Sequence, residues 1–160
     1  MTPDSHHVTH RLSEAEFNPL RFFDGKLEAS GFFMDRGGKV RRRFTVDIHC
    51  QATDEQTSLH EYFTYDDGET EDRIWVLQRQ SDTHFAGFCD DVDGQAECVI
   101  NGSQMSLRYD FFLSISGRKI KFHFDDMMVY FPDGRVVNRA KVSKFGITVG
   151  ELVISFARAA

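Results

Sequence analysis

The chain has 160 residues, of which 19 are Lys or Arg and 25 are Asp or Glu, so its formal net charge is −6. This length suits one domain. The negative charge argues against a general nucleic-acid binder, because neutralising phosphates requires clustered cations. Hydrophobic residues make up 41% of the chain, which excludes global disorder. The 16 Phe residues favour strands and an apolar interior.

The start of the chain is polar, and its first 21 residues are predicted to form a tail or a short helix. We assign residues 22–158 to a single β-barrel domain, as argued below. The tail has no apolar run of signal-peptide length, and no window approaches the roughly 18 apolar residues of a membrane helix. The three Cys residues show no CxxC spacing. We therefore expect a cytoplasmic protein with free thiols and no transmembrane segment.

From Lys26 onward, apolar and polar residues alternate, which is typical of half-buried strands. Short turn signals, of which Asn101-Gly102 is the strongest, separate the alternating segments. A helix is compatible with the pattern only before Phe22. In chain order, the predicted strands cover residues 27–33, 40–50, 59–65, 73–79, 84–89, 96–100, 105–115, 120–128, 136–142 and 147–156.

About ten strands joined by tight turns must pair antiparallel with their sequence neighbours. Such a set either closes into an up-and-down barrel or splits into a sandwich. Nearly every connection reads as a hairpin, so we predict an all-β fold, an antiparallel up-and-down β-barrel of the calycin or lipocalin kind. Ten strands enclose more space than side chains usually fill, and we therefore expect an internal cavity.

Three charged residues, Glu61, Arg73 and Asp126, share strand faces with aromatic and aliphatic residues. An unpaired buried charge is too costly to keep, so each must be paired, hydrated or neutralised. Glu61 and Arg73 lie on the two arms of one hairpin and can meet across the ladder. We predict an internal Glu61–Arg73 ion pair. It serves either to fix the strand register or to let Arg73 anchor a ligand carboxylate or phosphate.

Motifs for other chemistry are weak or absent. The seven His residues show no zinc-site spacing, and the cluster His6, His7 and His10 in the polar tail indicates adventitious metal affinity only. His123 and Asp125 share a predicted outer face and offer weak metal binding at most. No nucleophile motif and no phosphate-binding glycine loop is present. We expect no metal and no cofactor, and we interpret residues 41–43, Arg-Arg-Arg, as a solvated basic stripe.

Several groups of residues resemble the DUF3833 family of bacterial proteins. Residues 36–44, RGGKVRRRF, are similar to that family's DRxGxVxRRF opening. The likeness covers residues 22–156, nearly the whole chain. The other matching groups are residues 61–69 with 73–75, residues 91–96, residues 125–127, residues 138–140 and residues 144–147.

The resemblance implies a calycin-like barrel, in agreement with the strand pattern, and it implies no reaction, because the family is uncharacterised. Many members look like lipoproteins with a signal peptide and lipobox, which implies the cell envelope as an alternative location. This sequence shows neither feature. The matching polar positions are Glu61, Arg73, Asp126, Asn138, Arg139 and Lys144.

Three functions fit these observations. In the first, the barrel binds a small hydrophobic or amphipathic molecule, such as a fatty acid or another lipid. In the second, it is an enzyme in which Glu61 or Asp126 acts as a general base on a hydrophobic substrate. In the third, it is a filled barrel that serves as an interaction module. A cavity of a few hundred cubic ångströms favours the first two. A fully paired Glu61–Arg73 favours the binder, and a solvent-accessible carboxylate without an Arg partner favours the enzyme. The expected ligand-binding residues are Glu61, Arg73, Trp75, Tyr109, Phe124, Asp126, Asn138 and Arg139, although the pattern leaves open which of the last two faces inward.

Overall fold

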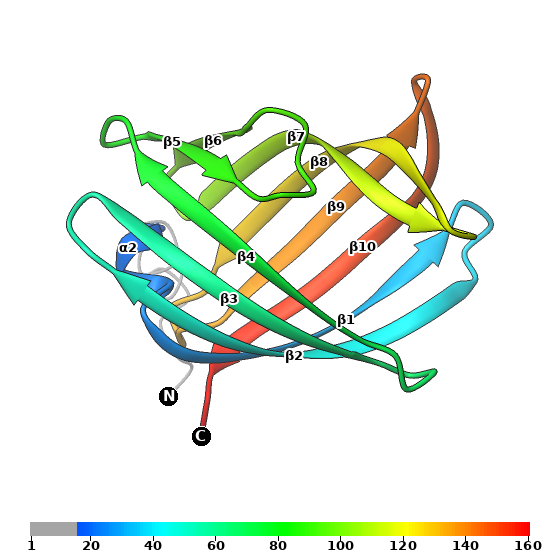
Figure 1. The fold of residues 1–160 in the computed structure, drawn as a ribbon. Coiled ribbons are helices and arrows are strands. Elements are labelled where there is room, and N and C mark those ends of the chain that lie inside the picture. Colours follow the sequence, from blue (N-terminus) through cyan, green and yellow to red (C-terminus); the bar gives the residue numbers. More distant parts are fainter. Residues whose placement is uncertain (1–15) are drawn as a thin grey trace, which may run out of the picture.

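Ten antiparallel strands form a closed barrel in the computed structural model, which describes residues 16–160 (Figure 1). Each strand pairs with its sequence neighbours, and β1 pairs with β10 to close the sheet. The predicted up-and-down barrel is therefore confirmed. The strands are β1 (Gly25–Asp35), β2 (Val40–Ala52), β3 (Gln56–Tyr65), β4 (Thr70–Arg79), β5 (His84–Phe88), β6 (Ala96–Asn101), β7 (Gln104–Ile115), β8 (Arg118–Tyr130), β9 (Val136–Lys144) and β10 (Ile147–Arg158).

The burial of side chains follows the period of two in the sequence. In β7, Met105, Leu107 and Tyr109 are buried, whereas the residues between them are half-buried or exposed. The paired strand β8 buries Phe124 and Met128 in the same way. Because successive side chains of a strand point to opposite faces, these alternating residues all enter the barrel interior.

The seam between β1 and β10 requires a glycine. Gly31 lies opposite Ile154 on β10 and opposite Phe44 on β2. A Cβ atom at this position would collide with the carbonyl oxygen of Val153 and with the ring of Phe44. The missing side chain therefore lets the first and last strands approach closely where the barrel closes.

A short helix, α2 (Pro19–Phe22), covers one end of the barrel. Asn18 caps it, and a proline occupies its first turn, as is common at helix starts. Phe22 and Phe23 are buried there against an aromatic cluster that includes Tyr130. The Thr57 hydroxyl donates to the carbonyl oxygen of Phe23 at 2.5 Å. Most of the tail predicted for residues 1–21 lies outside the described residues.

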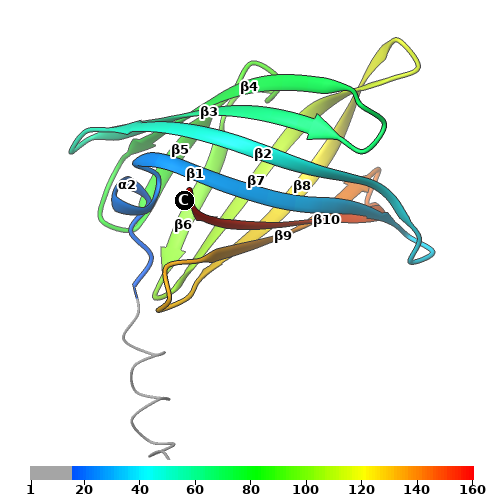
Figure 2. The ribbon, with the colours of Figure 1, turned by 90° about the horizontal axis from the view of Figure 1, so that it is seen from below.

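The opposite end of the barrel is formed by four hairpins, which connect β1 with β2, β3 with β4, β7 with β8, and β9 with β10 (Figure 1 and Figure 2). The helix α2 and these hairpins thus lie at opposite ends, and the strands run between them. Within residues 16–160, no helix has the length and apolar character needed to cross a membrane.

Candidate functional site

The interior of the barrel contains a cavity of about 1040 Å³. Its wall extends from the buried Phe23, beside α2, to Glu69 and Ile115 at the hairpin end, both of which are exposed. The cavity is therefore closed by aromatic side chains at one end and opens between the hairpins at the other. The wall is mostly apolar, and its largest aromatic contributors include Phe63, Trp75, Tyr109, Phe111, Phe122 and Phe124.

One of the eight residues that the sequence assigned to the site does not line the cavity. Arg139 lies on the outer face of β9, where its Nη2 atom is 2.7 Å from Oε1 of Glu151. Its neighbour Asn138 is 2% exposed and faces inward, because adjacent side chains of a strand point to opposite faces. The residues that the structure brings together in the wall are Glu61, Arg73, Trp75, Tyr109, Phe124, Asp126 and Asn138.

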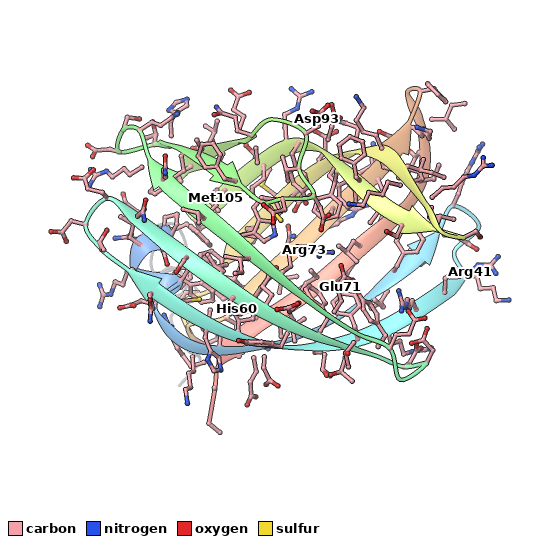
Figure 3. All side chains as sticks on the ribbon, viewed as in Figure 1. Arg41, His60, Glu71, Arg73, Asp93 and Met105 are labelled. Carbon is pink, nitrogen blue, oxygen red and sulfur yellow. The ribbon has the colours of Figure 1, made fainter. Side chains whose placement is uncertain are left out.

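Glu61 and Arg73 lie directly opposite each other in the β3–β4 ladder, but no ion pair joins them. The predicted Glu61–Arg73 ion pair is wrong. Arg73 instead donates through Nη2 to Glu71, on its own strand and face, and through Nε to Oδ2 of Asp91 at 3.5 Å. Figure 3 shows Arg73 and Glu71 close together near the middle of the barrel. Two carboxylates thus bind the guanidinium: Glu71, nearer the hairpin end on the same strand, and Asp91, in the β5–β6 loop.

Aromatic rings hold the Arg73 side chain in this direction. Its Cζ atom is 5.1 Å from the ring centroid of Phe63 and 4.7 Å from that of Phe111. Only 14% of the side chain is exposed. Cation–π contacts of this kind contribute more where water is excluded, so the rings stabilise a buried guanidinium that is already neutralised by carboxylates.

Glu61 is left as a buried carboxyl group in the cavity wall. It is 8% exposed, and no side chain within residues 16–160 forms a hydrogen bond or an ion pair with it. Burial raises the pKa of Glu61 to about 7, although the charge of Arg73 partly offsets that rise. Near neutral pH, Glu61 therefore populates both its neutral and its charged form, and it has free hydrogen-bonding capacity toward the cavity.

A second polar group lies deeper in the same wall. Oδ2 of Asp126 accepts hydrogen bonds from the hydroxyl of Tyr109 at 3.0 Å and from Nδ2 of Asn138 at 3.1 Å. The Oδ1 atoms of Asp126 and Asn138 are both buried and lack a partner in the described chain. Burial raises the pKa of Asp126 to about 7, despite these two hydrogen bonds. A proton on Asp126 removes the buried charge and makes the carboxyl a donor as well as an acceptor, so the group is suited to a neutral, structural role.

The mouth of the cavity carries a network that sequence reasoning missed. The Arg42 guanidinium lies 3.5 Å above the Tyr65 ring centroid and pairs with Glu69 at 2.8 Å. The Tyr65 hydroxyl donates to Oε2 of Glu71 at 2.8 Å. Glu71 could have been found, because it shares the strand face of Arg73. No local signal marks Asp91, which reaches the cavity from the loop between β5 and β6.

The described residues contain no group of three or more metal-ligating side chains. His123 lies on the outer face, with Nδ1 3.0 Å from Asp110 and Nε2 3.3 Å from Asp125, and the cluster at residues 6–10 is outside the described part of the chain. The cysteines are free. Burial raises the pKa of Cys50 and of Cys98 to about 12, which keeps both thiols protonated and unreactive.

Comparisons with known proteins support the architecture. A family model described as protein of unknown function (DUF3833) matches residues 4–158. A solved structure of an S-type phycobiliprotein lyase, CPES from Guillardia theta, is similar over 99% of each chain, with a TM-score of 0.67 and 10% identity. A redesigned β-barrel bound to DFHBI, mFAP1, is similar over 89% of this chain and 100% of its own, with a TM-score of 0.48 and 9% identity. No curated protein sequence matches the chain.

Proposed function

The chain belongs to the DUF3833 family, and we propose that its barrel binds one elongated, largely apolar small molecule in the central cavity. The observation that carries this proposal is the cavity of about 1040 Å³, walled by aromatic side chains and open at one end. Ligand pockets typically enclose a few hundred to about a thousand cubic ångströms and place a few polar groups in an apolar wall. The lyase likeness, at 10% identity, supports the architecture alone.

The charges of the wall favour a ligand whose polar part donates hydrogen bonds. The three arginines that line the cavity already have carboxylate partners. Arg73 has Glu71 and Asp91, Arg42 has Asp67 and Glu69, and Arg41 has Asp35. A fatty-acid carboxylate would compete with those partners and approach further acidic groups, so Arg73 is poorly placed to anchor it. Among the ionisable residues of the described cavity wall, Glu61 is the one whose side chain has no ion pair or side-chain hydrogen bond. We therefore propose a neutral or cationic donor, such as an amide, a hydroxyl or an amine, as the polar part of the ligand.

Native mass spectrometry of gently purified protein, followed by organic extraction, tests whether a ligand is bound. Binding is then measured with oleamide and oleic acid, which share one alkyl chain and differ in the polar end. We expect oleamide to bind more tightly than oleate at pH 8, and Glu61→Gln to reduce that preference. Equal binding of the two, with no change in Glu61→Gln, would overturn the donor proposal, and no binding of any extracted or added apolar molecule would overturn the binding function.

An enzyme is the second candidate, because Glu61 is an interior carboxyl without an arginine partner. Burial brings its pKa to about 7, which suits a general base at neutral pH. Asp126 is less suited, since Tyr109 and Asn138 already occupy Oδ2. The released ligand should be incubated with the protein and followed by mass. Conversion that is lost in Glu61→Gln while binding persists would support the enzyme, and an unchanged ligand would support the binder. The open cavity argues against a filled interaction module.

The cytoplasmic location belongs to the same proposal. The three cysteines are free, although Cys89 is only partly buried. Disulfides form mainly in oxidising compartments, so free thiols support a reducing environment. Fractionation of cells followed by immunodetection tests this location, and recovery in the cell envelope would contradict it.

A further inference from the structure

An exposed aromatic residue occupies the tip of the β9–β10 hairpin. Phe145 is 91% exposed, the largest value among the exposed large hydrophobic side chains of the described chain. Lys144 and Ile147 pair at the ends of the two strands, so Phe145 and Gly146 form a two-residue turn. Nothing in the described chain covers the Phe145 ring apart from the Lys144 ammonium, whose Nζ lies 4.6 Å from the ring centroid.

The backbone of this turn is also unfavourable for phenylalanine. Phe145 has a φ of 51° and Gly146 a φ of 76°. Two-residue turns of this kind favour Asn, Asp or Gly at both positions, because other residues are strained at positive φ. The neighbouring β7–β8 hairpin adopts the same conformation with Ser116 and Gly117, at φ of 50° and 77°. Phe145 therefore lowers the stability of the folded chain in two ways: its backbone is strained at positive φ, and its apolar ring is exposed to water.

Further exposed apolar and basic side chains lie at this hairpin and at the tip of the β7–β8 hairpin. Ile147 is 58% exposed, and Ile115, at the end of β7 and in the cavity wall, is 43% exposed. Arg118 and Lys119 begin the strand β8 and are exposed. Residues 111–124 and 141–150, which include these two hairpins, contain no Asp or Glu. We call Ile115, Arg118, Lys119, Lys144, Phe145 and Ile147 the β7–β10 rim.

The charges of this rim differ from those of the β3–β4 hairpin across the mouth. Within residues 16–160, no carboxylate pairs with Arg118, Lys119 or Lys144, in contrast to the cavity arginines Arg42 and Arg73. The β3–β4 hairpin across the mouth is acidic, with Asp66, Asp67 and Glu69. A chain of net charge −6 thus carries, at its β7–β8 and β9–β10 hairpins, cations without a carboxylate partner in the described chain together with exposed apolar side chains.

We propose that the β7–β10 rim docks on an anionic lipid bilayer, with Phe145 and Ile147 inserted at the interface and Arg118, Lys119 and Lys144 among the lipid phosphates. Aromatic and aliphatic side chains flanked by cations are the chemistry that binds such interfaces. An anionic surface repels the acidic β3–β4 hairpin, so the barrel should tilt toward this rim. Because Ile115 belongs both to the rim and to the cavity wall, docking brings the cavity mouth to the bilayer surface. The proposal does not depend on the identity of the ligand.

Vesicle flotation with the purified, full-length protein tests this docking. The vesicles contain phosphatidylcholine alone or phosphatidylcholine and phosphatidylglycerol in a three-to-one ratio. We expect binding to the mixed vesicles only, with weaker binding at high salt. Phe145→Asn should reduce the affinity by about tenfold or more, since one buried Phe ring contributes at least that factor. The substitution Lys119→Gln should reduce the affinity for the mixed vesicles about fivefold.

The control variants separate docking from folding. Phe145→Asn places a favoured residue in the turn, so its thermal midpoint should equal or exceed that of the wild type. Ile74→Thr removes an exposed apolar side chain from the outer face of β4, where Ile74 is 51% exposed, and should leave vesicle binding unchanged. Undiminished binding of Phe145→Asn to mixed vesicles would overturn the proposal. The proposal would also be overturned if the wild-type protein bound neither kind of vesicle, or if it formed a Phe145-dependent dimer in their absence.

Discussion

Glu61 and Arg73 face each other across the β3–β4 ladder, yet Arg73 makes its ion pairs with Glu71 and Asp91. As a consequence, charge is distributed unevenly in the barrel interior. The cation is neutralised toward the mouth, and Glu61 remains a buried carboxyl with free hydrogen-bonding capacity and a pKa of about 7. The binding and catalytic proposals both depend on this unpaired carboxyl group.

The stability of the barrel should fall as pH rises, because of Glu61. Its pKa is 4.5 in an ordinary setting and about 7 in the fold. Between these values the folded chain binds more protons than the unfolded chain, so the free energy of unfolding decreases by about 3 kcal/mol from pH 4.5 to 7 and then levels off. Asp126, whose pKa is also raised to about 7, adds a decrease of its own, so urea unfolding across that range should show a smaller decrease for Glu61→Gln than for the wild type. Glu97→Gln, on the outer face, is the control, and an equal slope in Glu61→Gln would contradict the assignment.

Replacing Arg73 should raise the pKa of Glu61 further. The guanidinium charge currently lowers that pKa, and Arg73→Met removes the charge while keeping an apolar stem between the rings of Phe63 and Phe111. We expect a carbon-detected NMR titration to place the Glu61 midpoint above 7, and unfolding at pH 8 to cost about 2 kcal/mol less free energy than in the wild type. Arg108→Met, which removes an exposed outer ion pair, should change stability by less than about 1 kcal/mol. A Glu61 midpoint that does not move would show that Arg73 has no electrostatic effect on it.

Closure of the barrel should be sensitive to Gly31. In Gly31→Ala the added methyl group meets the Val153 carbonyl oxygen and the Phe44 ring, and neither strand can move without breaking the β1–β10 ladder. We expect a loss of at least about 2 kcal/mol in the free energy of unfolding. Gly37→Ala is the matched control, because its methyl group would meet only Asp35 Oδ1, at 3.4 Å. Equal stability of the two variants would show that the seam tolerates a side chain.

The closed end of the cavity should depend on a single buried hydroxyl. Thr57→Val keeps the size of the side chain but leaves the Phe23 carbonyl oxygen without its donor, which stands at 2.5 Å in the wild type. We expect a loss of about 1–3 kcal/mol and faster hydrogen exchange in α2. Thr57→Ser retains the donor and should lose less, about 1 kcal/mol. The proposed role of the hydrogen bond fails if Val is tolerated better than Ser.

Much of the cavity wall was predictable because strand geometry is local. The alternation in residues 105–115 and 120–128 indicates which side chains share a face, and it identified Tyr109, Phe124 and Asp126 as interior residues. The same rule left Asn138 and Arg139 undecided, because both are polar and lie in a short apolar strand. Packing decided between them: Asn138 joins Asp126, and Arg139 pairs with Glu151 outside.

The partners of the charged residues were less predictable. Cross-strand neighbours follow from hairpin register, which brought Glu61 opposite Arg73. Whether opposite charges meet depends also on side-chain direction and on competing partners. Glu71, two residues along the same face, competes locally, and Asp91 arrives through a loop that folds over the barrel. The strain at Phe145 was also hidden, since the amino-acid sequence between two predicted strands gives no φ angle.

The sequence by itself determined the strands, their turns and the inward face of most of them, because these follow from a period of two and from local turn chemistry. Only the tertiary structure decided that β1 pairs with β10, how large the cavity is, that no described side chain pairs with Glu61, and that the rim around Phe145 is exposed. Each of these depends on distances between residues far apart in the chain. Such distances are set by the packing of the whole barrel.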